Sequence, residues 1–499
     1  MALADFYERA AVAASQVIAG FSPDLFRRIL EQENVGLAIG RQGAASEEGK
    51  ALAELSIRLL ARLYPSIDLR AEVSSEGERL QDIARTINPQ IEFRSGANVG
   101  IGIGSGSPCF ETTFYAGSDG WDALLSTEEA VKTGHSGNPL GAGVAACFAV
   151  GSIFKHLLLP TLEVGNTTSF CFSTFSCEKT KTPNDIPNAG WSLKSDAVLV
   201  GVGAIGNGAV WTLGRAPLHG NVHIVDHEPL ELSNLQRYVL ASRSDVGRWK
   251  TDVANEHFCG GVTCISHRTQ WAKFVQDHGY NWRQVLVALD SASDRRSVQA
   301  ALPEWIANAW TQPGDLGVSV HDRLDGAGAC LCCLYLPSDK APNEDELVAA
   351  ALSVPELVRD VRTLLHTGGP VGRQLLEAVA QRLDRPIEDV LPYEGRTIRE
   401  LYVEGICGGR LIPLGMIGTP RQELHVPLAH QSALAGVLLA AALIRRSIGT
   451  SGATTMITRI DVIGPLGEFL TQPSLKTQTG QCICEDDDYV RAYRAKFGP

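Results

Sequence analysis

The chain has 499 residues, of which 44% are apolar and 20% are charged, and its formal net charge is −12 at pH 7. This length exceeds what one hydrophobic core supports, so we expect more than one domain. The composition excludes a disordered or fibrous chain, and the negative charge disfavours a nucleic-acid surface, which needs clustered Lys and Arg.

The first residues show no basic stretch followed by an apolar core and a small-residue cleavage site, so they do not resemble a secretory signal. Two apolar stretches, 140–154 and 432–444, are shorter than the roughly 20 residues that span a bilayer. We therefore expect a cytoplasmic protein. Its expected partners are small molecules and proteins, and neither nucleic acid nor a membrane.

Residues 1–190 are predicted to form a first α/β domain. A helical pattern covers 47–65, glycine-punctuated strand-like stretches follow it, and an apolar helix begins after Pro139 and Leu140. A second small-residue helix follows Pro427 and Leu428. This echo indicates a duplicated architecture.

The second α/β unit begins with the apolar strand at 197–200, which runs into a glycine-rich turn and a helix. Gly201, Gly203 and Gly206 give the pattern G-x-G-x-x-G, in which free backbone N–H groups and a helix N-terminus hold a phosphate. The next apolar strand ends at Asp226, an acid placed to bind ribose hydroxyls. The same pattern serves NAD, FAD and ATP, so the glycines do not choose the chemistry.

Polar residues further along the chain favour adenylation over hydride transfer. Asn234, Arg237, Lys250 and Asp290 lie at predicted strand ends and turns. A hydride-transfer site needs none of them. Attack on the α-phosphorus of ATP uses all of them, because Arg and Lys stabilise the charge that develops and a carboxylate holds Mg²⁺ against the phosphates.

These residues resemble the pattern of the ubiquitin-activating enzyme superfamily, which also includes the adenylyltransferases of sulfur-carrier proteins. Asp226 and Glu228 stand where the family has two aspartates, whereas Tyr238 stands where it usually has glutamine. The other matching residues are Ser233, Asn234, Leu235, Arg237, Gly247, Lys250, Ala288, Leu289, Asp290 and Arg295.

The resemblance implies two Rossmann-like adenylation-type domains, the first inactive and the second active, with a helical catalytic-cysteine insertion. Residues 1–190 are the inactive domain, and residues 191–340 and 411–499 form the active one. Residues 341–410 have a helical pattern without glycine-rich strand signals, and form the insertion. The first domain lacks the Asn, Arg, Lys and Asp set.

The resemblance also implies the roles of individual residues. Asp226 and Glu228 are expected on the ribose side of ATP, while Asn234, Arg237 and Lys250 contact the phosphates and Asp290 positions Mg²⁺. Domains of this superfamily pair, and the inactive partner often supplies an arginine to the nucleotide. Arg27 and Arg28 are the candidates here, although a basic pair on a helix is usually only solvated. A homodimer stays open.

Twelve cysteines without an export signal are expected to be reduced thiols. Cys330, Cys332 and Cys333 form one cluster, and Cys482 and Cys484 form another. Relatives carry two such pairs, so we assign Cys330, Cys333, Cys482 and Cys484 to a structural Zn²⁺ and leave Cys332 as a spare. The alternative is a pair of buried thiol clusters without zinc.

Cys407 stands apart, between the helical insertion and the closing apolar helix, and glycines flank it on both sides, so its sulfur is expected to be approachable. In the family the cysteine that accepts the acyl group lies in this same crossover between the zinc pair and the last helix. The alternative is a packed loop cysteine.

The function that this resemblance implies is ATP-dependent activation of the C-terminal carboxylate of a ubiquitin-like protein. A thioester on Cys407 and transfer to a separate conjugating enzyme would follow, since we find no conjugating-enzyme domain in the chain. The alternatives are an adenylyltransferase for a sulfur-carrier protein or peptide without a thioester step, an NAD-dependent oxidoreductase, and a non-catalytic scaffold.

Overall fold

A computed structural model describes residues 3–18, 21–104, 110–159, 169–180, 186–312, 315–336, 344–402, 426–449, 455–464, 466–467 and 470–498. The chain divides into two compact units. The larger comprises Met1–Tyr7, Arg27–Leu336 and Pro427–Pro499, and the smaller comprises Glu8–Phe26 and Pro337–Val426. Cys407 lies outside the described residues.

The first sheet of the larger unit has eight strands in the order β3-β2-β1-β4-β5-β6-β7-β8. They are β1 Val35–Ile39, β2 Ser66–Ala71, β3 Glu92–Phe93, β4 Val99–Ile103, β5 Thr112–Asp119, β6 Asp122–Ser126, β7 Ser169–Ser173 and β8 Glu178–Thr180. The central strands β1 and β4 are buried along their whole length, as expected of parallel strands covered by helices on both faces.

The second sheet has nine strands, eight of them in the order β12-β11-β10-β13-β14-β15-β16-β17, with β9 paired to β11. They are β9 Trp191–Ser192, β10 Ala197–Val200, β11 Leu218–Val225, β12 Val262–His267, β13 Gln284–Val287, β14 Trp305–Gln312, β15 Asp315–His321, β16 Met456–Ile460 and β17 Thr471–Pro473.

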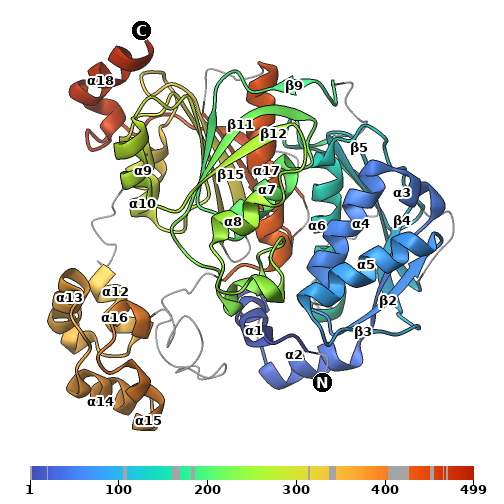
Figure 1. The fold of residues 1–499 in the computed structure, drawn as a ribbon, viewed down its shortest axis with the longest axis horizontal. Coiled ribbons are helices and arrows are strands. Elements are labelled where there is room, and N and C mark those ends of the chain that lie inside the picture. Colours follow the sequence, from blue (N-terminus) through green and yellow to red (C-terminus); the bar gives the residue numbers. More distant parts are fainter. Residues whose placement is uncertain are drawn as a thin grey trace. The chain divides into compact units, whose positions relative to one another are not determined.

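The two sheets repeat one topology. In each, five strands pair in parallel and three further strands extend the sheet by antiparallel pairing. Each also has a long apolar helix between the first and second added strands, α6 Pro139–Leu158 or α17 Ala429–Ile448. The predicted pair of Rossmann-like domains is therefore confirmed (Figure 1).

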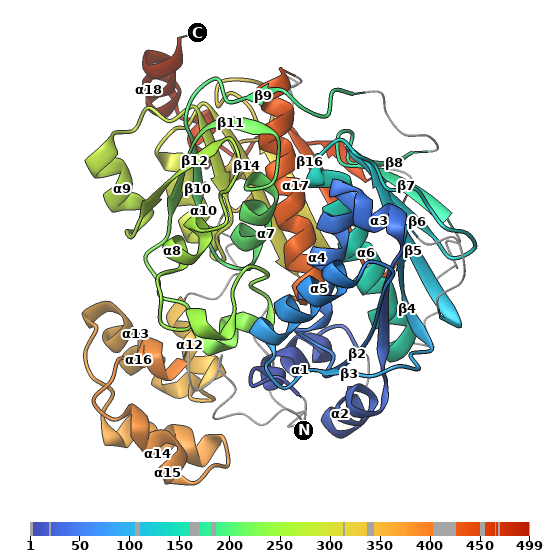
Figure 2. The same ribbon diagram turned by 45° about the vertical axis from the view of Figure 1, so that its right-hand side comes forward.

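Helices α6 and α17 lie side by side between the sheets, with α7 (Ala204–Leu213) and α4 (Glu47–Leu60) against them (Figures 1 and 2). A Cβ atom added at Gly436 would lie 2.3 Å from the carbonyl oxygen of Ile205, so α17 needs this glycine to approach α7. Both long helices have 20 residues, more than their apolar stretches suggested. By length and composition they could cross a membrane, but 78% of each apolar window is buried in this fold.

The remaining elements of the larger unit are short or peripheral. They are α2 Pro23–Gln32, which begins in the smaller unit, α3 Arg41–Ala45, α5 Ser74–Ile87, η1 Leu232–Gln236, η2 Arg243–Asp245, α8 Lys250–Asn255, α9 Trp271–His278, α10 Ala292–Ala300, α11 Leu331–Leu334, η6 Ile483–Glu485 and α18 Asp487–Phe497.

The smaller unit is helical in its described part and has its own apolar core. Val361, Leu376, Val379 and Tyr393 are among the buried residues of that core. Its elements are α1 Tyr7–Ser15, α12 Glu344–Ala351, η3 Pro355–Leu357, α13 Val358–Thr367, α14 Arg373–Arg382, α15 Ile387–Val390, η4 Leu391–Tyr393 and α16 Ile398–Glu400. The helical character predicted for the insertion agrees with these elements.

Candidate nucleotide site and cysteine cluster

The glycine-rich turn joins β10 to α7 in a conformation that requires its glycines. Gly201 has a φ of +91°, in the left-handed region that residues with a Cβ atom rarely adopt. A Cβ at Gly206 would lie 2.2 Å from the carbonyl oxygen of Gly201. Gly203 is the N-cap of α7 and has no side chain to cap the helix, so the first N–H groups of α7 have no side-chain cap and suit a phosphate.

Asp226 ties this turn to the neighbouring strand. It follows β11 directly, and its carboxylate accepts the N–H of Val202 at 2.8 Å and the N–H of Glu228 at 2.9 Å. Because the carboxyl ends of parallel strands share one sheet edge, Asp226 lies beside the phosphate-binding turn. This is where an acid can bind the ribose of a nucleotide.

Lys250 lies at the same edge of the sheet, at the start of α8 in the segment that connects β11 to β12. Its Nζ lies 2.5 Å from a carboxylate oxygen of Glu228, and only 7% of its side chain is exposed. Burial alone would lower the pKa of Lys250, but the charges of Asp226 and Glu228 and the hydrogen bond to Glu228 outweigh burial and raise it. Lys250 is therefore a fixed cation next to the turn.

Tyr238 lies at the centre of the site, which the sequence did not indicate. Its ring centroid is 5.4 Å from the Lys250 Nζ and 5.6 Å from the Arg237 guanidinium carbon. A Cβ at Gly203 would lie 3.4 Å from the Tyr238 hydroxyl. Burial raises the pKa of Tyr238, opposed by the two cations and supported by the charge of Asp290, so the phenol stays protonated at neutral pH. The signal available in the sequence was its departure from the family's glutamine.

Asn234 and Arg237 belong to the short 3₁₀ helix η1 and the residue after it. The Asn234 side chain accepts the N–H of Glu231 at 3.0 Å and is 8% exposed, so it orders this turn. Besides its contact with the Tyr238 ring, Arg237 makes one long hydrogen bond in the described structure, at 3.5 Å to the carbonyl of Ser233. Most of its donors are thus available to a phosphate.

Asp290 lies just beyond β13 and is exposed. It has no hydrogen bond or ion pair with the described residues, and its charge acts on Tyr238. Arg295 donates to the Leu289 carbonyl through Nε at 2.9 Å and also contacts the Tyr335 hydroxyl. Arg295 therefore fixes the backbone before Asp290. A carboxylate with unoccupied oxygens at this edge fits a role as a Mg²⁺ ligand.

The four cysteines predicted to form one site are together. The Sγ atom of Cys330 lies 3.8 Å from that of Cys333 and 3.4 Å from that of Cys482. Cys333 lies 3.5 Å from both Cys482 and Cys484. A tetrahedral zinc ion with Zn–S bonds of about 2.3 Å holds sulfurs roughly 3.8 Å apart, so the set fits zinc. The Cys332 thiol points instead toward the Arg296 carbonyl, at 3.9 Å.

The first sheet has part of the same site but not its cations. Strand register places Gly40 and Glu72 where the second sheet has Gly201 and Asp226. The N–H of Arg41 donates to Glu72 at 3.1 Å, as that of Val202 does to Asp226. However, β2 leads through α5 to β3 without any counterpart of residues 228–250. Lacking that segment, the first half has no equivalent of the Arg237 and Lys250 cations.

Two other features lie away from the turn. Arg27 and Arg28 are exposed on α2, and Arg27 pairs with Glu31 at 3.0 Å. A cavity of about 450 Å³ is lined by α4, Arg79 and Arg215. Its cations are already paired with acids of their own surroundings, so we assign it no ligand.

Comparisons with known proteins match two separate parts of the chain. Residues 192–459 match the family model described as the ThiF family, and residues 38–159 match one described as prokaryotic E2 family C. An uncharacterized protein of Sinorhizobium fredii, y4jF, is 41% identical over 513 residues, covering 100% of this chain and 98% of that protein.

Crystal structures of E. coli MccB are similar at low identity. The complex with AMPCPP and MccA is 14% identical with a TM-score of 0.35, covering 58% of this chain and 67% of that one. The complex with MccA-N7isoASN is also 14% identical, with a TM-score of 0.36, covering 57% and 66%.

The match at residues 38–159 bears on the expectation of a separate conjugating enzyme. We found no conjugating-enzyme domain in the sequence, yet this segment matches a model that carries the E2 name. Its central strands are the parallel strands of the first Rossmann-like sheet.

Proposed function

The chain belongs to the ThiF family of ATP-dependent adenylating enzymes, and from this premise we propose that it activates the C-terminal carboxylate of a ubiquitin-like protein. The observation that carries the proposal is the convergence of Lys250, Arg237 and Asp290 around Tyr238, beside the glycine-rich turn. A nicotinamide site has no use for two cations and a free acid there.

In this reaction a carboxylate oxygen of the substrate attacks the α-phosphorus of ATP. The bond from that phosphorus to the bridging oxygen breaks, and pyrophosphate leaves with its electrons. Lys250 and Arg237 stabilise the charge that develops on the phosphate oxygens, and the N–H groups of the turn hold the phosphates. Asp226 binds the ribose, with Glu228 orienting Lys250. Asp290 would hold Mg²⁺, which supplies Lewis-acid neutralisation of the phosphate charge.

We further propose a thioester step at Cys407. Its thiolate attacks the acyl carbon, the thioester forms, and AMP leaves. The helical elements at 344–402, which precede Cys407, support this assignment. A conjugating enzyme's cysteine then receives the acyl group.

The acceptor for that last transfer is proposed to be a separate protein. The E2 name of the model matched by residues 38–159 raises the alternative of an acceptor in the same chain. Of the two cysteines in that segment, Cys109 lies outside the described residues. Cys147 is fully buried in α6 and burial raises its pKa, so it does not offer a reactive thiolate.

The four-cysteine cluster is proposed to hold a structural Zn²⁺ that joins α11 to η6. We also propose that the protein works in the cytoplasm without membrane or nucleic-acid partners.

The decisive experiment is ATP–pyrophosphate exchange with magnesium and a panel of purified ubiquitin-like proteins that end in glycine. We expect exchange with the wild type and none with Asp290→Ala. A reductant-sensitive adduct that disappears in Cys407→Ala, while exchange persists, supports the thioester step. Exchange without such an adduct supports an adenylyltransferase for a sulfur-carrier protein or peptide. Binding of NAD without binding of ATP contradicts the proposal altogether.

A further inference from the structure

Residues 238–241, which follow Arg237 in the candidate site, accept hydrogen bonds from the first half of the larger unit, the part built on the first sheet. Two guanidinium groups donate to their carbonyl oxygens, Arg58 from α4 and Arg62 from the turn that follows α4. Arg62 donates to Tyr238 at 2.6 Å and to Ala241 at 2.7 Å, and Arg58 donates to Val239 at 3.3 Å. Three of four consecutive carbonyls therefore accept hydrogen bonds from the last turn of α4 and the residues just after it.

Arg62 is unusual because it is 1% exposed and has no carboxylate partner among the described residues. Its remaining donation goes to the Arg58 carbonyl at 2.6 Å, and its Nε has no partner in the described structure. Burial, and then the neighbouring charge of Arg58, lower the pKa of Arg62. A buried cation held only by carbonyls is costly unless those carbonyls must be held in place.

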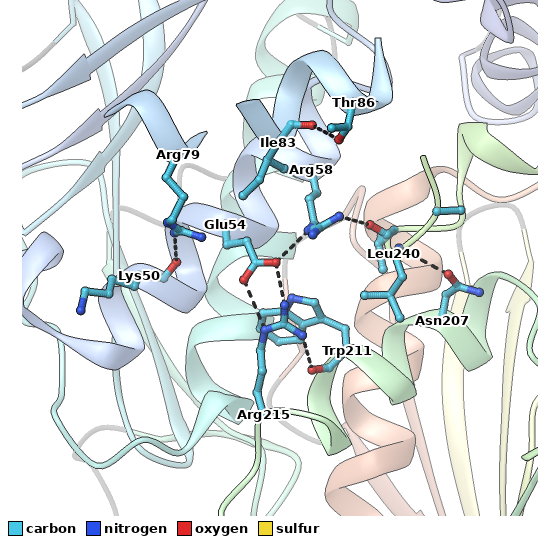
Figure 3. Close-up of polar contacts among 12 residues, drawn as sticks. Lys50, Glu54, Arg58, Arg79, Ile83, Thr86, Asn207, Trp211, Arg215 and Leu240 are labelled. Carbon is cyan, nitrogen blue, oxygen red and sulfur yellow. Dashed lines mark hydrogen bonds and ion pairs between the residues drawn. The ribbon is translucent and has the colours of Figure 1, made fainter. Parts of the chain in front are cut away.

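The same segment is fixed from its other side by Asn207 of α7. The Asn207 carboxamide oxygen accepts the N–H of Leu240 at 3.3 Å (Figure 3). Its NH₂ group donates to the carbonyls of Val202 at 2.9 Å and Gly203 at 3.0 Å. Asn207 therefore links residues 238–241 to the glycine-rich turn itself.

Arg58 is held in place by an acid shared between the halves. Glu54 accepts from Arg58 at 2.8 Å and from Arg215, just past the end of α7, at 2.7 Å (Figure 3). The contacts therefore run without a break from α4 through residues 238–241 and Asn207 to the phosphate-binding turn.

We propose that Arg62 is a positioning residue for nucleotide binding: by holding the Tyr238 and Ala241 carbonyls, it fixes Arg237 and Tyr238 against Lys250 and the turn. The first half, which lacks the cations of a nucleotide site, thus supplies the support of the second half's site. The inference rests on the proposed use of that site for Mg·ATP.

The test measures the dissociation constant of Mg·ATP on the full chain by titration calorimetry. We expect Arg62→Gln to weaken binding about tenfold, the order of effect that a residue exerts through packed neighbours. Arg62→Lys should recover only part of this, because an ammonium lacks the planar fork that serves two carbonyls. The control is Arg79→Gln, which removes an arginine of the same half that pairs with Glu76 and makes no hydrogen bond to residues 238–241 in the described structure. It should leave binding unchanged.

Hydrogen exchange on the wild type tests the same idea without a substitution. By linkage, Mg·ATP should slow exchange of the Leu240 and Ala241 amides and of the α4 amides near Arg62. Protection confined to residues 201–206 and Lys250 overturns the inference, and so does unchanged affinity in a folded Arg62→Gln protein. If that variant does not fold, wild-type exchange decides. A wild type that binds no Mg·ATP refutes the proposed function instead.

Discussion

Replacing Glu54 by Gln is predicted to destabilise the contact between the two halves at neutral pH. Glu54 is buried, which alone would raise its pKa, yet the charges and hydrogen bonds of Arg215 and Arg58 lower it from 4.5 to about 2. At about 1.4 kcal/mol per pKa unit, this shift corresponds to roughly 3 kcal/mol of stability. Burial also lowers the pKa of Arg58 despite the pairing, so desolvation of the arginine offsets part of that gain. We expect a net loss of about 2 kcal/mol.

The stabilisation by Glu54 should depend on pH in one direction. Because the folded-state pKa of Glu54 lies below 4.5, the stabilisation is fully present above pH 4.5 and is lost as the pH falls toward 2. Urea unfolding followed by tryptophan fluorescence, from pH 7 down to pH 3, should show wild type and Glu54→Gln converging.

The matched control is Glu47→Gln on the same helix. Its carboxylate pairs with Lys50 but is 68% exposed, so we expect a change within about 0.5 kcal/mol. A Glu54→Gln protein as stable as wild type at pH 7, or a loss that is the same at pH 7 and pH 3, would refute the reasoning.

Three other predictions concern the metal, the catalytic cation and acid stability. Elemental analysis should find zinc in the wild type and in Cys332→Ser but not in Cys482→Ser, and only Cys482→Ser should have a lower melting temperature; metal-free wild type would contradict this. Lys250→Met should lower kcat/KM for pyrophosphate exchange about 100-fold, as loss of a preorganised charge does, and a change below threefold would remove Lys250 from the mechanism. Burial lowers the pKa of His430 from 6.5 to about 3, so its neutral form stabilises the fold above pH 6.5 and this contribution is lost toward pH 3. His430→Leu should therefore lessen acid destabilisation in that range, and an unchanged pH profile would contradict this.

Local spacing in the sequence determined much of the nucleotide site. The glycine pattern after an apolar strand predicted a turn that requires Gly201, and the structure places Asp226 beside it. The two cysteine pairs also meet as predicted, with Cys332 apart. The turn and the cysteine pairs can be predicted from the sequence because strand periodicity, turn chemistry and ligand type act over a few residues.

The paired Rossmann-like fold followed from the same local patterns together with the family resemblance. The residue types favoured adenylation over hydride transfer, and the resemblance supplied what they did not, namely the role of each residue and a protein carboxylate as the substrate. The role of Cys407 stays a prediction, since it lies outside the described residues.

Only the tertiary structure revealed what holds the site in shape. Arg62 meets Tyr238, and Glu54 meets Arg215, across more than 160 residues of sequence, because the two sheets pack together through their helices. No periodicity marks such contacts in advance. They depend on which faces meet when two sheets pack together, and a buried arginine just past the end of an amphipathic helix looks in sequence like any solvated one.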